Sequence, residues 1–274
     1  MRYTKIEVLF HKKPPYFIGS QIRGAFGYAL KSVVCINPSY KCEECFAKDN
    51  CIYFDFYEKR NSFHKYRLDF KLGGEFYDFS LLLFDKVCEK LPYILSSLQM
   101  MLTKNGLGKD RERVEEFSMF INGVNSYKDK KITIPDNYIK EFRVNDFYPN
   151  IKLELITPLR LKKDNRLIKA DNLTVYDLIN SIYQRQMRLL DKEYKKFPYE
   201  IKGEITKREL NFKELTRYSN RQKTKMMLGG IIGHIEIEGL NQESYNVLKL
   251  GELIGVGKQT VFGLGKIKIE RLDV

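Results

Sequence analysis

The sequence is poor in histidine and has no long apolar run. Its 274 residues include 3 histidines, and no stretch approaches the roughly 18 uninterrupted apolar residues that a membrane-spanning helix needs. The start, MRYTKIEVLF, has neither the apolar core nor the small-residue cleavage site of a secretory signal. We therefore expect neither a membrane anchor nor secretion, and we expect the protein in the cytoplasm.

Several motifs of nucleotide-dependent and metal-dependent enzymes are missing as well. The chain has no HExxH motif, no GxSxG nucleophile elbow and no clustered acidic pair of the kind that metal-dependent nucleases use. The dinucleotide-binding spacing GxGxxG is absent, and Gly257-Lys258 is followed by Gln259 where a P-loop needs Ser or Thr. ATP and NAD are poor candidates as ligands, and any RNA cleavage would use metal-free acid–base chemistry.

What the sequence does contain is apolar residues for cores and an excess of positive charge. The hydrophobic fraction is 43%, with 18 Phe and 18 Tyr, and the length suits two domains of about 130 residues each. Lys and Arg number 48 against 35 Asp and Glu, which gives a net charge of +13. Such an excess in a folded chain favours a polyanionic partner, with nucleic acid first, although a basic surface without a partner is the alternative.

Four of the five cysteines fall within 17 residues. A CxxC pair flanked by two further cysteines suits four thiolates that converge on one metal ion, because a cytoplasmic protein seldom keeps disulfides. We predict a closed structural site for zinc, with an iron–sulfur cluster or four free thiols as alternatives. The fifth, Cys88, stands among apolar residues and is expected in the core. The predicted ligands are Cys35, Cys42, Cys45 and Cys51.

The periodicity predicts the same order of elements twice, and hence an α+β fold of tandem ferredoxin-like (RRM-like, βαββαβ) domains with a small cysteine-rich metal-binding insertion. Residues 1–123 form the first domain with the cysteine insertion at 35–51, residues 124–147 are a polar linker, and residues 148–274 form the second domain. Strands are expected at 3–10, 64–72, 75–84, 150–156, 229–240 and 261–272, and helices from Ser20 to Val34 and at 86–101, 174–190 and 245–254.

Two segments of the second half suit RNA binding. The segment RYSNRQKTK combines Arg217, Arg221, Lys223 and Lys225 with Tyr218 and no acid, although a solvated basic loop is the alternative. The segment GVGKQTVFGLG contains four glycines and a lysine, a composition that lets backbone N–H groups approach a phosphate. A tight turn between a helix and a strand explains the same glycines equally well.

The chain resembles the CRISPR-associated endoribonuclease of the RAMP superfamily that cuts precursor CRISPR RNA within its repeats, in the branch that contains cysteines. The resemblance rests on segments that run in family order over nearly the whole chain, none of which is specific alone. They are IRGAFGYAL at 22–30, the four cysteines, FHKYRL at 63–68, LPYILSSLQMMLTKNGLGKDR at 91–111, ITPLRLK at 156–162, RYSNRQ at 217–222, GGIIG at 229–233 and the glycine-rich segment at 255–265.

The resemblance implies metal-independent cleavage by attack of the ribose 2′-OH, which leaves a 2′,3′-cyclic phosphate and a 5′-hydroxyl. It also implies CRISPR repeat RNA as partner and contact with subunits of a CRISPR effector complex; a non-catalytic RNA-binding subunit of such a complex is the alternative. The position of His64 matches a family histidine and makes it the first candidate for the general acid or base, with His11 second and His234 third. The implied RNA-binding residues are Arg217, Ser219, Arg221, Gln222, Lys223, Gly255, Gly257, Lys258, Gly263 and Gly265.

Overall fold

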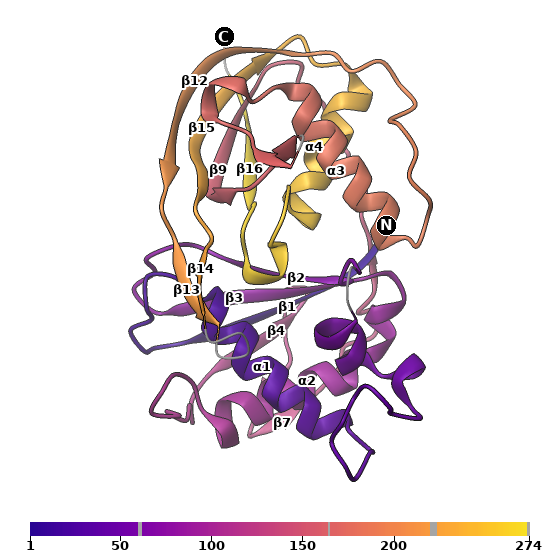
Figure 1. Cartoon of the computed structure of the whole chain (residues 1–274), viewed down its shortest axis with the longest axis vertical. Coiled ribbons are helices and arrows are strands. Elements are labelled where there is room, and N and C mark those ends of the chain that lie inside the picture. Colours follow the sequence, from indigo (N-terminus) through magenta and orange to yellow (C-terminus); the bar gives the residue numbers. More distant parts are fainter. Residues whose placement is uncertain (60–61, 164, 220–223, 273–274) are drawn as a thin grey trace. The chain divides into compact units, whose positions relative to one another are not determined.

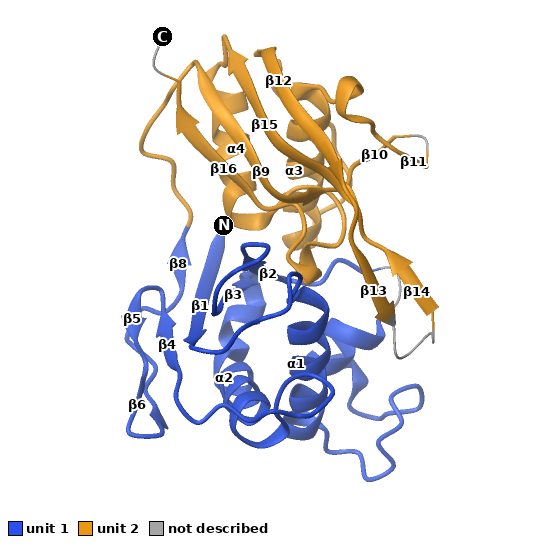
Figure 2. Cartoon of the chain, turned by 90° about the vertical axis from the view of Figure 1, so that its left-hand side faces the viewer, with its two compact units in different colours: residues 1–141 blue, residues 142–274 orange. Residues whose placement is uncertain are grey.

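The computed structural model describes residues 1–59, 62–163, 165–219 and 224–272, and the chain divides into two compact units, residues 1–141 and 142–274 (Figure 2). Each unit is described by itself below. Within the described ranges, none of the helices has the length and apolar character that crossing a bilayer would require.

Unit 1 has the strand order β2-β3-β1-β4 with antiparallel pairing, which is the ferredoxin-like arrangement (Figure 1). Alternation in the first strand buries Ile6, Val8 and Phe10, and the helical stripe that includes Ile22 and Phe26 packs against the same core. The main elements are β1 (Arg2–Phe10), α1 (Gly19–Val34), β2 (Tyr66–Phe70), β3 (Tyr77–Phe84), α2 (Leu91–Met100) and β4 (Ser118–Ile121).

Unit 2 repeats the plan with the strand order β12-β15-β9-β16. Its first helix begins with a capping box, in which Thr174 and Asp177 satisfy each other's backbone N–H groups. Its elements are β9 (Ile151–Leu159), α3 (Val175–Leu189), β12 (Glu204–Lys213), β15 (Gly230–Glu238), α4 (Gln242–Ile254) and β16 (Ile267–Arg271). The predicted fold class, two ferredoxin-like halves in tandem, is confirmed.

Both units also contain shorter helices and strands. In unit 1 they are η1 (Lys48–Asn50), the π-turn η2 (Phe54–Glu58), η3 (Asp85–Lys90), η4 (Met101–Asn105), β5 (Val124–Asn125), β6 (Tyr127–Lys128), β7 (Lys131–Ile132) and β8 (Lys140–Glu141). In unit 2 they are β10 (Lys162–Lys163), β11 (Arg166–Leu167), η5 (Ala170–Asn172), β13 (Thr216–Ser219), β14 (Thr224–Met227) and η6 (Thr260–Phe262). The pair β13–β14 continues beyond the ends of β12 and β15 as a hairpin (Figure 2).

The structure differs from the sequence prediction at three places. The polar segment predicted as a linker over 124–147 supplies β5, which pairs with β4, and β8, which pairs with β1, so that residues up to 141 belong to unit 1. The first helix begins at Gly19, and the side chain of Ser20 makes no cap. Strand β12 has a mostly exposed pattern without a clear alternation, which is why periodicity did not reveal it.

Candidate functional site

His64 lies between the π-turn η2 and strand β2 and is half-buried. Its Nδ1 atom is 2.7 Å from the backbone oxygen of Asp55. A carbonyl oxygen only accepts hydrogen bonds, so Nδ1 carries the proton of the neutral ring and Nε2 carries the lone pair. The backbone of η2 thus holds His64 in the tautomer that a general base requires at Nε2.

The ring of Tyr66 lies near this histidine, and Tyr66 is in turn held by an arginine. The rings of His64 and Tyr66 are 6.1 Å apart, and the hydroxyl of Tyr66 accepts a hydrogen bond of 3.1 Å from Nε of Arg23. The guanidinium of Arg23 also lies 4.6 Å from the ring centre of Tyr57. Burial raises the pKa of both tyrosines, so they remain neutral phenols. Arg23 comes from α1, where it belongs to the segment IRGAFGYAL, and the sequence alone gave it no role.

The other two histidines have different surroundings. His11 follows β1, is exposed, and has its ring 5.3 Å from that of Phe76. His234 lies in β15 with Nε2 3.5 Å from a carboxylate oxygen of Glu209 on the neighbouring strand, on the face opposite the buried Ile235. Of the three, His64 has a ring nitrogen whose proton is assigned by a backbone contact.

The glycine-rich segment is a tightly packed connection between α4 and β16. The N–H of Val256 donates to the oxygen of Gly265 at 2.9 Å, and a Cβ at Gly265 would lie 1.8 Å from the oxygen of Val256. Gly255, Gly263 and Gly265 are all buried. Close packing of backbone therefore explains these three glycines, whereas Gly257 is half-buried and Lys258 is exposed; contact of this segment with a phosphate stays a prediction.

The first three residues of the segment RYSNRQ, Arg217 to Ser219, lie in β13, and Arg217 contacts the glycine-rich segment. The guanidinium of Arg217 lies 4.4 Å from the ring centre of Phe262, which brings two predicted RNA-binding segments together. Tyr218 is exposed and Ser219 pairs with Thr224 in the hairpin. The predicted RNA-binding residues Arg221, Gln222 and Lys223 lie outside the described residues.

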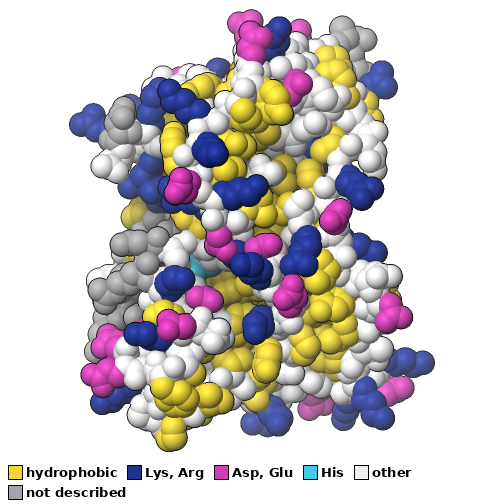
Figure 3. All heavy atoms as spheres, turned by 90° about the vertical axis from the view of Figure 1, so that its right-hand side faces the viewer, with side chains coloured by type: hydrophobic (Ala, Val, Ile, Leu, Met, Phe, Trp, Pro, Cys, Tyr) yellow, Lys and Arg dark blue, Asp and Glu magenta, His cyan; other side chains and the backbone are white. Residues whose placement is uncertain are grey.

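Positive charge is dispersed over the face shown in Figure 3, with acidic side chains among the basic ones. Net charge alone consequently locates no binding surface there. The β10–β11 hairpin is a local exception whose basic residues form too short a cluster to stand out in the sequence. Its exposed cations are Lys162, Lys163 and Arg166, and the exposed Lys169 lies two residues after β11.

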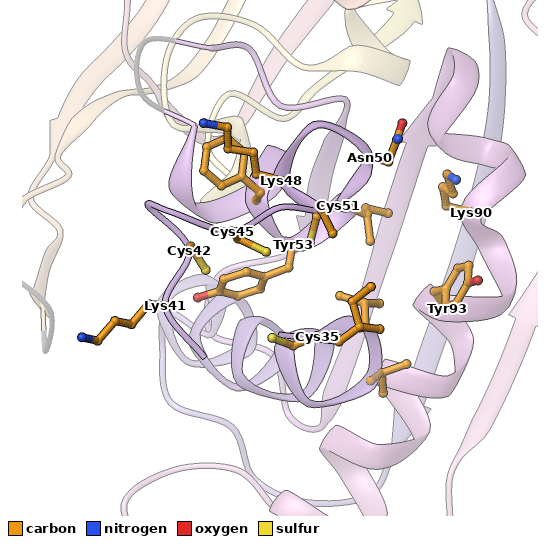
Figure 4. A pocket seen from close by; sticks show the side chains of 16 residues that line it. Cys35, Lys41, Cys42, Cys45, Lys48, Asn50, Cys51, Tyr53, Lys90 and Tyr93 are labelled. Atoms are coloured by element: carbon orange, nitrogen blue, oxygen red, sulfur yellow. The ribbon is translucent and has the colours of Figure 1, made fainter. Parts of the chain in front are cut away.

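The four clustered cysteines are half-buried free thiols that line one cavity of about 280 Å³ between the end of α1 and the segment that follows it. Figure 4 shows the ring of Tyr53 between Cys42 and Cys45 on one side and Cys35 on the other. This ring is stacked on Tyr57 at 5.3 Å, and its hydroxyl donates to Glu58 at 3.2 Å. In the described ranges, no group of three or more His, Cys, Asp or Glu side chains is arranged to hold a metal ion.

Burial raises the pKa of the Cys42 thiol, despite the nearby charge of Lys31. A raised pKa keeps this sulfur in the thiol form, which binds metals and reacts with electrophiles less readily than the thiolate. Cys88 is fully buried, as predicted for a core residue. Metal binding by the other four stays a prediction.

Two family models match the chain in succession. Residues 4–137 match a family, AF_1859_N, described as an N-terminal domain, and residues 153–267 match the CRISPR-associated endoribonuclease Cas6. An uncharacterized protein of Archaeoglobus fulgidus is 23% identical over 93% of this chain and 92% of its own length. These matches follow the two units of the structure.

Solved structures share the fold over nearly the whole chain. A product complex of a Cas6 from Thermus thermophilus has a TM-score of 0.60 at 15% identity, and covers 98% of this chain and 100% of that one. A second Cas6 product complex has a TM-score of 0.58 at 12% identity with the same coverage. A RAMP protein that binds different RNA substrates has a TM-score of 0.50 at 12% identity, with 99% and 100% coverage. The second unit thus matches the CRISPR-associated endoribonuclease Cas6 over residues 153–267, and the whole chain shares its fold with solved Cas6 and RAMP structures.

Proposed function

We propose that this protein binds CRISPR repeat RNA and cleaves the precursor transcript without a metal ion. The observation that carries the proposal is the Cas6 match over residues 153–267, together with a histidine in unit 1 whose tautomer suits a base. Nε2 of His64 takes the proton of a ribose 2′-OH, the 2′-oxygen bonds to the adjacent phosphorus, and the bond from phosphorus to the 5′-oxygen breaks. Protonation of the departing oxygen leaves a 5′-hydroxyl beside a 2′,3′-cyclic phosphate.

RNA binding in this proposal falls mainly to unit 2. The exposed Tyr218 offers a ring on which a base can stack, and Arg217 on the same strand offers a planar cation. Lys258 and the cations of the β10–β11 hairpin add positive charge at the surface for phosphates. Release of the product to subunits of a CRISPR effector complex is the partnership that follows from this role.

The decisive experiment is a cleavage assay on end-labelled repeat RNA in EDTA. We expect one major cut, with a downstream product whose 5′-hydroxyl is phosphorylated directly by polynucleotide kinase, and an upstream product whose 3′ end is extended by poly(A) polymerase only after the cyclic phosphate is opened and removed. A scrambled RNA of equal length is the control. Cleavage that requires added Mg²⁺, or a 3′-hydroxyl product, would overturn the proposed chemistry.

A non-catalytic RAMP subunit is the alternative function, favoured by the small number of histidines. It predicts that repeat RNA binds more tightly than scrambled RNA and stays intact for hours at a protein concentration that saturates binding. Equal affinity for repeat and scrambled RNA, with the same steep dependence on salt, would instead indicate general RNA binding.

The four-cysteine metal site is a separate proposal, with zinc first and an iron–sulfur cluster second. Binding would require the Tyr53 ring to leave the space between the sulfur atoms, and the site would stabilise the fold without entering the chemistry. We expect about one zinc per chain after gel filtration, and none in the Cys42→Ser/Cys45→Ser variant; the control is Cys88→Ser, which lies outside the cavity. A brown protein that contains iron would indicate a cluster, and metal-free wild-type protein would refute the site.

A further inference from the structure

Arg160, in the connection that follows β9, is held between two glycine segments of unit 2. Its backbone oxygen accepts a hydrogen bond of 2.9 Å from the N–H of Lys258, and the residue forms an isolated bridge with Gly257. Its guanidinium Nη1 donates to the backbone oxygen of Gly229. The side chain thus lies where the end of β9, the start of β15 and the glycine-rich segment meet.

The glycines at this junction make room for Arg160. A Cβ at Gly257 would lie 2.5 Å from the Arg160 oxygen. A Cβ at Gly230 would lie 2.5 Å from the oxygen of Leu159 and 3.0 Å from Cγ of Arg160. Real Cβ atoms do not come within 2.5 Å of a backbone oxygen, so the path of the backbone at Leu159 and Arg160 requires glycine at both positions, and at Gly230 the Arg160 side chain packs closely as well.

The charge of this arginine has no counter-charge in the described part of the chain. No carboxylate there pairs with the Arg160 guanidinium, and burial lowers its pKa with no opposing cause. A half-buried cation costs solvation free energy that one bond to a neutral carbonyl does not offset, and a neutral donor would satisfy the Gly229 oxygen equally well. An arginine keeps its proton under such conditions, so the charge persists and lacks an anion.

The surrounding chain increases the positive charge. The β10–β11 hairpin begins two residues after Arg160 and carries three exposed cations, with the exposed Lys169 two residues beyond it, and Lys258 is exposed beside the bridged Gly257. Like charges at this density repel one another, which is unfavourable unless a polyanion neutralises them. The planar guanidinium offers two parallel N–H donors to an oxyanion, a geometry that suits phosphate.

We propose that Arg160 binds a phosphate of the RNA backbone, with Lys258 and the β10–β11 hairpin on either side. The proposal rests on the proposed function, because repeat RNA is the polyanion it names. Arg160 acts in binding, and the chemistry belongs to unit 1. The phosphate supplies the missing counter-charge, and the bond to Gly229 fixes the guanidinium plane before RNA arrives.

The test uses fluorescence anisotropy with a repeat RNA that carries a 2′-deoxyribose at the cleavage site and therefore stays intact. We expect Arg160→Met to raise the Kd about 10-fold and to reduce the slope of log K against log salt by about 0.7, the contribution of one phosphate in a single strand. Arg160→Lys retains the positive charge but loses the two parallel N–H donors of the guanidinium. It is expected to keep the salt slope of the wild type and to raise the Kd by less than Arg160→Met does. The matched control is Arg208→Met, since the Arg208 guanidinium also donates to a backbone oxygen, that of Leu173, at 2.7 Å.

A second measurement separates phosphate binding from damage to the fold. Repeat RNAs that each carry one neutral methylphosphonate are titrated against the wild type and against Arg160→Met. At one linkage, the modification should weaken binding to the wild type about 10-fold and leave binding to the variant unchanged, which a fold defect would not produce. If no linkage behaves in this way, or if Arg160→Met keeps the wild-type Kd and salt slope, the inference is wrong while cleavage of repeat RNA by the wild type still stands. If the wild type neither prefers nor cleaves repeat RNA, the proposed function fails instead.

Discussion

Units 1 and 2 share an order of elements and an order of strands, but they depart from the common plan at different connections. In unit 1 the long insertion lies between α1 and β2, and it contributes the cysteine cavity, η2 and His64. In unit 2 the departures follow β9, extend β12 and β15, and join α4 to β16. The cores of both units consist mainly of packed apolar side chains, so the candidate catalytic and RNA-binding residues lie on the connections between elements.

The two units also differ in the kind of side chain they place at these connections. Unit 1 holds a histidine whose tautomer is assigned by the Asp55 oxygen, among neutral tyrosines. Unit 2 holds cations, with its one histidine paired to Glu209. This contrast predicts that substitutions in unit 1 separate cleavage from binding, and that substitutions in unit 2 weaken binding or the fold.

The largest effect should come from the glycine-rich segment of unit 2. In Gly265→Ala, the new Cβ would lie 1.8 Å from the Val256 oxygen at a φ of +70°, so we expect a loss of about 3 kcal/mol in the free energy of unfolding. Gly239 has a φ of +71° with open space around it, and Gly239→Ala should lose about 1 kcal/mol from backbone strain alone. Urea unfolding measures both. Equal losses in the two variants would show that close packing is not the reason for Gly265.

Substitution of His64 is expected to affect cleavage and spare binding. His64→Ala should lower the single-turnover rate about 100-fold or more, because it removes the proton acceptor for the 2′-OH. The Kd for uncleavable repeat RNA should stay within about 2-fold of wild type, since the ring is an uncharged base in this scheme. His234→Ala is the matched control in unit 2 and should cleave at nearly the wild-type rate. A wild-type rate in His64→Ala would move the role elsewhere, with His11 as the next candidate.

Substitution in the β13–β14 hairpin is expected to weaken RNA binding and to spare cleavage. Arg217→Ala removes the contact with Phe262 and one cation, so we expect the Kd for repeat RNA to rise about 10-fold. At saturating protein, the single-turnover rate should change much less. Lys202→Ala, at an exposed lysine paired with Glu200 at 3.4 Å, provides the control in the same unit. A large fall in the cleavage rate at saturating protein would contradict the assignment of cleavage to unit 1 and of RNA binding to unit 2.

The smallest effect concerns an ion pair next to the His64 segment in unit 1. Lys65 and Asp85 lie 2.9 Å apart with side chains 14% and 20% exposed. Burial would raise the pKa of Asp85, but the hydrogen bond and charge of Lys65, with help from the Lys86 backbone, outweigh burial and lower the pKa below 3.8. The charged pair therefore stabilises the fold above about pH 4, and the contribution disappears as the pH falls through the folded pKa.

Asp85→Asn should cost about 1 kcal/mol at pH 7, and the difference from wild type should narrow near pH 3. Asparagine tolerates the left-handed backbone at this position, where φ is 54°, so the comparison isolates the charge. Glu89→Gln, in an exposed pair with Arg2, serves as the control and should leave stability unchanged. A difference that persists undiminished at pH 3 would assign the effect to packing.

Much of the fold could be predicted because local patterns repeat along the chain. The alternation in β1 and the apolar stripe of α1 are each visible within one element, and each is present in the structure. Strand β12 was not predicted, because its exposed position at the edge of the sheet leaves no alternation of buried and exposed residues. The strands in residues 124–141 were not predicted, because each is two residues long.

The candidate site was predictable only where a single residue carried the signal. The sequence has 3 histidines, and His64 became the first candidate because its position matches a histidine of the family that the chain resembles. Arg23 and Arg160 are two among many cations, and their surroundings come from residues distant in the chain, Tyr66 in one case and Gly229 in the other.

By itself, the sequence determined the succession of strands and helices, the two repeated halves and the excess of positive charge, because periodicity and composition are local or additive properties. Only the tertiary structure decided that three of the loop glycines serve backbone packing, that the Tyr53 ring lies among the cysteines that line one cavity, and that the Arg160 guanidinium has no carboxylate partner in the described chain. Those outcomes depend on which distant atoms come within a few ångströms of each other. The chain alone does not list such distances, because many arrangements satisfy the same local pattern.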